Sequence, residues 1–175
     1  MKVLGFAGSN SAASINKKLV SYVLQQAEAH TTELLDLNDY EVAIYSPERE
    51  SKDGIPDKIM ALAEKIAEAD ILIISLAEHN SSYSAAFKNV FDWMSRIPNR
   101  TVFVDKPLFL MATSPGVRGG QGVLEAAQDR FPRNGAAILE VFSLPQFHEN
   151  FTNGILSEPY HSELKTKLFS VLTNH

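Results

Sequence analysis

The feature that most constrains this chain is the run Ile71-Leu72-Ile73-Ile74-Ser75-Leu76, in which five of six side chains are apolar. A strand so uniformly apolar leaves no face for water. It is typical of the centre of a parallel sheet that helices cover on both sides. Helical and strand patterns follow one another on either side of this run, which predicts an α/β fold.

The alternation of strand and helix patterns extends from end to end. We predict strands at residues 2–7, 32–37, 71–76, 107–113 and 137–142. Helices are predicted at residues 14–29, 56–66, 85–96, 122–131 and 162–173. No element is assigned to the polar stretch, broken by Pro and Gly, that precedes Pro56. Because crossovers between parallel strands are right-handed, this order predicts a doubly wound five-stranded parallel sheet in one domain, residues 1–175.

Composition narrows the class of protein. The chain has 175 residues, 45% of them hydrophobic, which suits one domain with a sizeable core. It has no cysteine, which excludes disulfides, thiolate metal sites and cysteine nucleophiles. The net charge is −5 and no basic run occurs, which argues against nucleic acid. The apolar run 3–7 is too short for a signal peptide or a membrane span, so we expect a cytoplasmic protein with no membrane partner.

In doubly wound sheets, ligands bind beyond the carboxyl ends of the strands. The first such segment here is GSNSAASIN, residues 8–16, which gathers small residues and hydroxyls before a helix. Backbone N–H groups and serine hydroxyls at a helix N-terminus can hold a phosphate without formal positive charge. An alternative is that Ser14 is a helix cap and Gly8 makes a tight turn. The segment alone does not separate the two interpretations.

Two further loops of unusual composition follow later strands. Residues 77–93, AEHNSSYSAAFKNVFDW, place a cluster of polar side chains directly after the apolar strand, and residues 114–122, SPGVRGGQG, contain four glycines. Glycine would let the backbone approach a flat ligand closely. Each segment could also be an ordinary surface loop. Neither GxGxxG nor GxxxxGK[ST] occurs, so the dinucleotide fingerprint and the Walker loop are absent.

Taken together, the three loops resemble the NAD(P)H-dependent FMN reductase family, flavodoxin-like enzymes that include quinone, azo-dye and chromate reductases. The family patterns are GS-x-R-x-x-S-x-N, PEYN-x-S with KN-x-x-DW, and S-x-G-x-x-GG. The matches are Gly8, Ser9, Ser14 and Asn16; Glu78, Asn80, Ser82, Lys88, Asn89, Asp92 and Trp93; and Ser114, Gly116, Gly119 and Gly120. The resemblance implies a flavodoxin-like sheet of order 2-1-3-4-5 with helices on both faces.

The resemblance also implies bound FMN, NADPH or NADH as co-substrate, and a quinone-like or other small electron acceptor. Phosphate contacts are expected from Ser9, Ser11, Ser14, Ile15 and Asn16. The flavin ring and ribityl chain are expected to lie against Glu78, His79, Asn80, Ser81, Ser114, Gly116, Gly119 and Gly120. The flavin carries the chemistry. No residue is assigned as catalytic acid, base or nucleophile, and no metal is expected.

The chain departs from the family pattern at several positions. Ser11 replaces the usual arginine of the first loop, which removes a charge-assisted phosphate contact of about 1.5–3 kcal/mol. Ala77 and His79 stand in place of proline and tyrosine, and Gly122 in place of an arginine. We therefore expect changes in cofactor affinity and substrate choice rather than in fold.

The resemblance further implies a homodimer or homotetramer. In the family, the helix at residues 85–96 often packs against a partner, so Phe87, Phe91 and Trp93 could face one. The alternative is that they face the sheet, which is favoured for Phe87 and Phe91.

Two other functions remain open. A flavodoxin-type electron carrier would share the fold, but it would shield the ring with aromatic side chains, for which the loops offer mainly His79 and Tyr83. A serine hydrolase of the SGNH type would use Ser9 as nucleophile and His148 as base. The hydrolase is the weaker alternative, since no acidic residue stands three positions before His148 and no GxSxG motif occurs.

Overall fold

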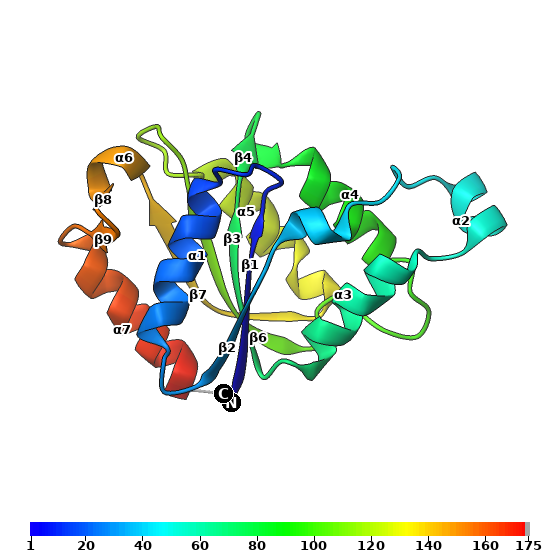
Figure 1. Ribbon diagram of the computed structural model, residues 1–175, viewed down its shortest axis with the longest axis horizontal. Coiled ribbons are helices and arrows are strands. Elements are labelled where there is room, and N and C mark those ends of the chain that lie inside the picture. Colours follow the sequence, from blue (N-terminus) through cyan, green and yellow to red (C-terminus); the bar gives the residue numbers. More distant parts are fainter. Residues whose placement is uncertain (174–175) are drawn as a thin grey trace.

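The computed structural model describes residues 1–173, and residues 174 and 175 lie outside the described part. Within residues 1–173, five parallel strands form the main sheet in the order β2-β1-β3-β6-β7 (Figure 1). These strands are β1 (Lys2–Gly8), β2 (Thr31–Leu35), β3 (Ile71–Leu76), β6 (Lys106–Thr113) and β7 (Ala136–Leu144). Counted in chain order, the arrangement is 2-1-3-4-5, so the flavodoxin-like prediction is confirmed.

Five helices form the two outer layers of the molecule. They are α1 (Ile15–Gln26), α3 (Asp57–Glu68), α4 (Ala85–Met94), α5 (Gln121–Arg130) and α7 (Tyr160–Thr173). Apolar side chains of α1 and α7 share one buried cluster with one face of the sheet, and those of α3, α4 and α5 share another with the opposite face. All six residues of β3 are buried, as expected of a strand covered on both sides.

Several short elements were not predicted. They are η1 (Leu37–Tyr40), α2 (Pro47–Asp53), the hairpin β4 (Glu78–His79) and β5 (Ser82–Tyr83), η2 (Pro132–Asn134), α6 (Phe147–Asn150), and the hairpin β8 (Phe151–Thr152) and β9 (Ile155–Leu156). Helix α2 has no buried residue and projects from the body of the protein (Figure 1). Local capping holds it, because the Ser46 hydroxyl accepts a hydrogen bond from the N–H of Arg49.

The aromatic residues of α4 pack inside the chain. Phe87, Phe91 and Trp93 are each at most 4% exposed, which confirms the sheet-facing alternative favoured for Phe87 and Phe91 and shows that the partner-facing alternative is wrong. The Trp93 indole N–H donates to the Ala43 carbonyl at 2.8 Å, and the Asn89 amide bonds the same connection between η1 and α2. Pairing with the chain's own backbone leaves these side chains no polar group for a second subunit.

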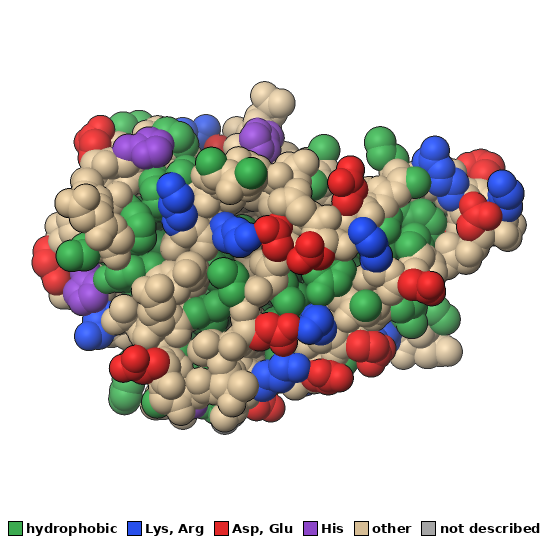
Figure 2. All heavy atoms as spheres, in the orientation of Figure 1, with side chains coloured by type: hydrophobic (Ala, Val, Ile, Leu, Met, Phe, Trp, Pro, Cys, Tyr) green, Lys and Arg blue, Asp and Glu red, His purple; other side chains and the backbone are tan. Residues whose placement is uncertain are grey.

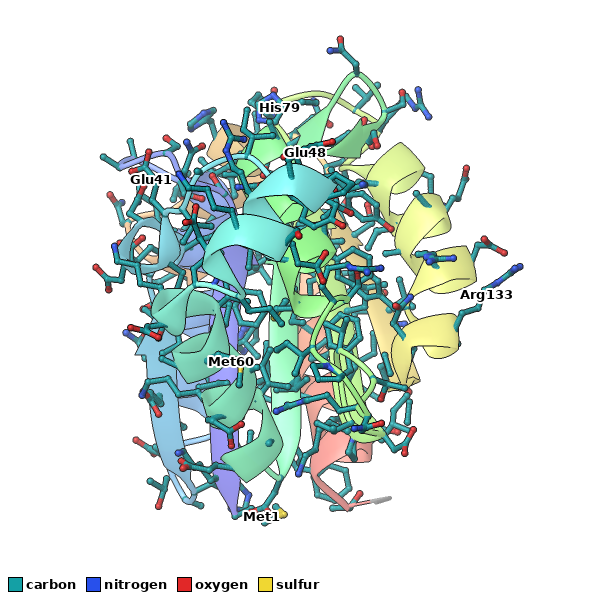
Figure 3. All side chains as sticks on the ribbon, turned by 90° about the vertical axis from the view of Figure 1, so that its right-hand side faces the viewer. Met1, Glu41, Glu48, Met60, His79 and Arg133 are labelled. Carbon is teal, nitrogen blue, oxygen red and sulfur yellow. The ribbon has the colours of Figure 1, made fainter. Side chains whose placement is uncertain are left out.

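The parallel strands bring their carboxyl ends to one end of the molecule. Figure 3 shows His79, which follows β3, at the end opposite Met1, which precedes β1. The loops after β1, β3 and β6 therefore share one edge of the sheet. No helix within residues 1–173 is long and apolar enough to cross a membrane. The same residues contain no cluster of His, Asp and Glu that could hold a metal ion.

Candidate functional site

A cavity of about 250 Å³ opens where β1, β3 and β6 end. Its walls come from the three loops that the sequence singles out. The lining residues are Ser9, Ser11, Ala13, Ser14, Ile15 and Asn16 from the first loop and α1, Ala77, Glu78 and His79 from the second, and Thr113, Ser114 and Pro115 from the third. Segments separated by about a hundred residues thus meet at the switch point of the sheet, where this fold class places ligands.

The first loop ends in the N-terminus of α1. The Ser14 hydroxyl caps the helix by accepting a hydrogen bond from the N–H of Lys17 at 3.2 Å. The N–H groups of Ile15 and Asn16, in the first turn, have no acceptor within residues 1–173. The Ser9 hydroxyl accepts from the N–H of Ser11, also at 3.2 Å, which fixes the curvature of the loop. Capping by Ser14 therefore uses one N–H of the first turn and leaves two without an acceptor.

The side chain of Asn16 faces the protein. Its Oδ1 accepts from the Ser75 hydroxyl at 2.7 Å and from the N–H of Thr113 at 3.0 Å, while its Nδ2 donates to the Thr113 carbonyl at 3.2 Å. Only 3% of Asn16 is exposed. This amide joins α1 to the ends of β3 and β6. It fixes the relative position of two cavity walls, and it leaves the backbone N–H of Asn16 without an acceptor within residues 1–173.

The second loop folds into the hairpin β4–β5. Its two turn residues, Asn80 and Ser81, have φ of 51° and 59°, the left-handed conformation that a tight two-residue hairpin requires. The Glu78 carboxylate accepts a hydrogen bond from the N–H of Val123, in the first turn of α5, at 2.8 Å. A carboxylate in this place satisfies an unpaired donor and interacts favourably with the helix dipole. A Cβ on Gly122 would lie 3.0 Å from this carboxylate, so glycine there lets the hairpin pack closely on α5.

Tyr83, at the end of the hairpin, points into the core. Its ring stacks on Phe131 with centroids 6.0 Å apart and planes 5° apart. Its hydroxyl is buried and has no hydrogen-bond partner within residues 1–173, and burial raises its pKa to about 12. Tyr83 therefore anchors the second loop to α5 from behind. It does not shield the cavity, contrary to the role that an electron carrier would give it.

The third loop depends on two glycines in left-handed conformation. A Cβ on Gly119 would lie 2.4 Å from the Ser143 hydroxyl, and one on Gly120 would lie 2.7 Å from the Cβ of Ala112. Both φ values are positive, 59° and 81°. The loop also bonds to the start of α6, since the Ser114 carbonyl accepts from the N–H of Phe147 at 3.0 Å. The two glycines thus allow the close packing of the third loop that places Ser114 and Pro115 at the cavity wall.

The cavity offers hydroxyls and amides rather than charge. Its lining contains no Lys or Arg, and its one acidic residue, Glu78, already bonds α5. With Ser11 at the position where the family pattern has arginine, the cavity lining has no Lys or Arg of its own. The donors present, two free N–H groups and the serine hydroxyls, still suit a phosphate monoester at a helix N-terminus.

The predicted site residues divide into two groups. Ser9, Ser11, Ser14, Ile15, Asn16, Glu78, His79 and Ser114 line the cavity. Asn80, Ser81, Gly116, Gly119 and Gly120 lie in the same loops but outside the lining. Four lining residues were not assigned from sequence, namely Ala13, Ala77, Thr113 and Pro115. They lie next to assigned positions, and their side chains carry little chemical signal.

The hydrolase alternative finds no support in the geometry. Ser9 lines the cavity, whereas His148 lies on α6 and lines a different hollow beside α1. The Ser9 hydroxyl bonds the backbone of Ser11, and no histidine within residues 1–173 pairs with it. A nucleophilic serine needs a base within hydrogen-bond reach.

Comparison with known proteins agrees with the arrangement of the loops. Residues 1–149 match the family model described as NADPH-dependent FMN reductase. An uncharacterized protein of Mycoplasma pneumoniae is 32% identical over 147 residues, covering 82% of this chain and 86% of that protein. The quinone reductase of Escherichia coli is 35% identical over 80 residues, covering 46% of this chain and only 42% of that protein's length.

A solved structure agrees in fold. FerB of Paracoccus denitrificans, described as a flavoenzyme NAD(P)H:(acceptor) oxidoreductase, superimposes with a TM-score of 0.79 at 24% identity, covering 98% of this chain and 94% of that one. This likeness extends the agreement beyond residue 149 to the C-terminal helix layer. The chain belongs to the NADPH-dependent FMN reductase family, and it is an oxidoreductase with FMN as cofactor and a nicotinamide nucleotide as co-substrate.

Proposed function

We propose that this protein passes a hydride from NADPH or NADH to FMN bound in the cavity, and from there to a quinone-like or other small acceptor. The observation that carries the proposal is the meeting of three chemically distinct loops at one cavity on the carboxyl edge of the sheet. Relatives named quinone reductase in E. coli and NAD(P)H:quinone oxidoreductase in Solanum tuberosum support this class of acceptor.

The first loop is proposed to hold the phosphate of FMN. The free N–H groups of Ile15 and Asn16 and the hydroxyls of Ser9, Ser11 and Ser14 would act together, with no cation in the lining. Capping by Ser14 keeps these donors pointing the same way. We expect affinity to come mainly from preorganised neutral donors, so FMN binding should depend only weakly on ionic strength.

The second and third loops are proposed to hold the flavin ring and ribityl chain. Bound FMN supplies the hydride chemistry. Glu78, His79 and Ser114 line this part of the cavity, and the turn residues Asn80, Ser81, Gly116, Gly119 and Gly120 set the backbone behind them. Glu78 already accepts a hydrogen bond from α5, so we assign it a role in placing the hairpin rather than in moving a proton.

The experiment that tests the function is titration of flavin-free protein with FMN, followed by NADPH and NADH oxidation with a quinone present. Saturable FMN binding and flavin-dependent oxidation of either nucleotide are expected. Absence of FMN binding at micromolar concentrations would contradict the proposal. The Gly120→Ala variant should weaken FMN binding, because its Cβ would displace the third loop. The matched control is Gly54→Ala, at the end of α2 with nothing within 4 Å, which should bind FMN as the parent protein does.

An electron carrier of the flavodoxin type would bind FMN but would not oxidise nicotinamide nucleotides without a separate reductase. No Phe, Tyr or Trp lines the cavity, which favours an accessible ring and therefore a reductase. Oxidation of NADPH by the isolated flavoprotein would exclude the carrier.

We also propose that the protein works in the cytoplasm as a homodimer or homotetramer. The projecting α2 and the exposed Ile44, 75% accessible, are surfaces that a second copy could cover. Light scattering coupled to size-exclusion chromatography measures the oligomeric state directly. A purely monomeric protein at working concentration would contradict this part of the proposal.

A further inference from the structure

A second hollow of about 450 Å³ lies beside the flavin cavity, between α1, α6 and the β8–β9 hairpin. Its lining residues are Lys18, Ser21, Tyr22, Gln25, Phe147, His148, Phe151, Asn153 and Gly154. The lining combines aromatic rings, the His148 imidazole, two amides, two hydroxyls and one ammonium group, with no acidic residue. This is the reverse of the flavin cavity, whose lining has one carboxylate and no Lys or Arg.

Lys18 is the only formal charge in this lining. It forms no ion pair and no side-chain hydrogen bond within residues 1–173, whereas its neighbour Lys17 is paired with Asp36. Figure 2 shows basic side chains over α1 next to hydrophobic ones. Glu149 follows the lining residue His148 in sequence, and its carboxylate accepts a hydrogen bond from the Gln146 side chain. Lys18 is therefore left available to an anionic group.

The floor of the hollow is held in place by its own contacts. The Tyr22 ring meets Phe151 edge-on with centroids 5.4 Å apart, and its hydroxyl hydrogen bonds with Nδ1 of His161. Phe151 in turn stacks on Phe147 with centroids 4.9 Å apart. Tyr22 and Phe147 are only 7% and 2% exposed, so they support the partly exposed ring of Phe151 and hold it in place before any ligand arrives.

The hollow and the flavin cavity are neighbours along α1. Ile15 lines the cavity, and Lys18 and Tyr22 line the hollow, so one edge of the helix runs from one to the other. At 1.5 Å per residue, Ile15 and Tyr22 are about 10 Å apart along the axis. The hollow and the cavity also meet at the third loop, where the N–H of Phe147 in the hollow donates to the carbonyl of Ser114 in the cavity at 3.0 Å. An extended dinucleotide can bridge this separation.

We propose that this hollow binds the adenosine end of the nicotinamide nucleotide and that Lys18 pairs with the 2′-phosphate that distinguishes NADPH from NADH. The inference rests on the proposed function, because that function places the nicotinamide half of the same dinucleotide over the flavin cavity. The partly exposed ring of Phe151 takes the adenine, and the amides of Gln25 and Asn153 and the hydroxyl of Ser21 hydrogen bond to its edge and to the ribose. Lys18 is thus the specificity-determining residue for the co-substrate.

The test uses FMN-loaded protein and two probes that differ by one phosphate, adenosine 2′,5′-bisphosphate and adenosine 5′-monophosphate, titrated by calorimetry. The bisphosphate is expected to bind about tenfold more tightly at low salt, since the added contact is charge-assisted. The Lys18→Ala variant should remove this difference, and Lys18→Arg should retain it. Lys52→Ala, an exposed lysine of α2, is the matched control and should behave as the parent protein.

Steady-state kinetics provide the second readout. Lys18→Ala should raise KM for NADPH several-fold while leaving KM for NADH and both kcat values unchanged. Equal binding of the two probes, or a Lys18→Ala variant that keeps the difference, would overturn the inference. If FMN does not bind but the bisphosphate still binds through Lys18, the proposed function fails and the subsite stands. If FMN binds and NADPH is oxidised with no dependence on Lys18, the proposed function stands and the inference about Lys18 fails.

Discussion

The side-chain amide of Asn16 and the backbone of Thr113 exchange two hydrogen bonds, although 97 positions separate them in sequence. A third bond, from the Ser75 hydroxyl, completes the set. The Asn16 amide thereby supplies hydrogen-bond partners for both the N–H and the carbonyl of Thr113, the last residue of β6. Burial makes the arrangement costly to disturb, because a buried polar group that loses its partner retains its full desolvation penalty.

We expect Asn16→Ala to lower the free energy of unfolding by about 3 kcal/mol, because it leaves both backbone groups of Thr113 and the Ser75 hydroxyl without partners. FMN affinity should fall as well, since two walls of the cavity lose their connection. Urea unfolding followed by circular dichroism measures the first effect. Ser75→Ala is the control, and it should cost about 1 kcal/mol because the amide keeps its bonds to Thr113.

The Ser11→Arg variant should tighten FMN binding. Ser11 lines the cavity, whose lining contains no Lys or Arg, so an arginine there would add a charge-assisted contact to the phosphate. We expect a gain of about 1.5 kcal/mol, or roughly tenfold in Kd, at low ionic strength. Quenching of FMN fluorescence measures it. The gain should shrink as salt is added, whereas affinity of the parent protein should change little. Equal affinity for riboflavin and FMN in the variant would contradict a phosphate contact.

The elements of the core could be predicted because their sequence patterns are long. β3 covers the same six residues as predicted, and the alternation of strands and helices was enough to fix the sheet order once the family resemblance was added. Helix α2 was missed because it has no apolar face, although Ser46 and Pro47 are typical of a helix N-terminus. The β8–β9 hairpin was missed despite Asn153-Gly154, a strong turn signal between two-residue strands.

The site was predictable in its loops but not in its detailed roles. Spacing after the strands identified the three segments, since the carboxyl ends of parallel strands share one edge. It could not show that the Asn16 amide faces the protein, that Glu78 caps α5, or that Tyr83 points into the core. Such roles depend on contacts between segments far apart in sequence. Polar residues of ligand-binding loops and polar residues that hold those loops look alike in sequence.

Alanine variants of three glycines separate the cost of a positive φ from the cost of steric overlap. Gly120→Ala should destabilise the protein by about 3 kcal/mol and weaken FMN binding, because it combines a φ of 81° with a Cβ 2.7 Å from that of Ala112. Gly54→Ala, at φ of 73° with nothing nearby, should cost about 1 kcal/mol. Gly116→Ala should be close to neutral, because its Cβ would meet only the Ser114 hydroxyl, at an ordinary contact distance of 4.0 Å. Thermal unfolding of the three variants measures the order.

The Tyr83→Phe variant should stabilise the protein by about 1 kcal/mol at neutral pH, since it removes a buried hydroxyl that has no partner and leaves the stacking on Phe131 intact. Its effect should grow with pH. Burial raises the pKa of Tyr83 to about 12 in the folded protein, whereas an unfolded tyrosine titrates near 10. Above pH 10 the unfolded state therefore loses this proton first, and the stability of the parent protein falls as pH rises.

The measurement is urea unfolding of both proteins between pH 7 and pH 11. Burial also raises the pKa of Tyr40, and a hydrogen bond to Glu50 raises that of Tyr45, so both proteins should lose stability at high pH. The difference between them isolates Tyr83, and it should be constant up to about pH 9 and then increase. A difference that stays flat to pH 11 would mean that the Tyr83 hydroxyl is ionised as easily in the folded protein as in the unfolded chain.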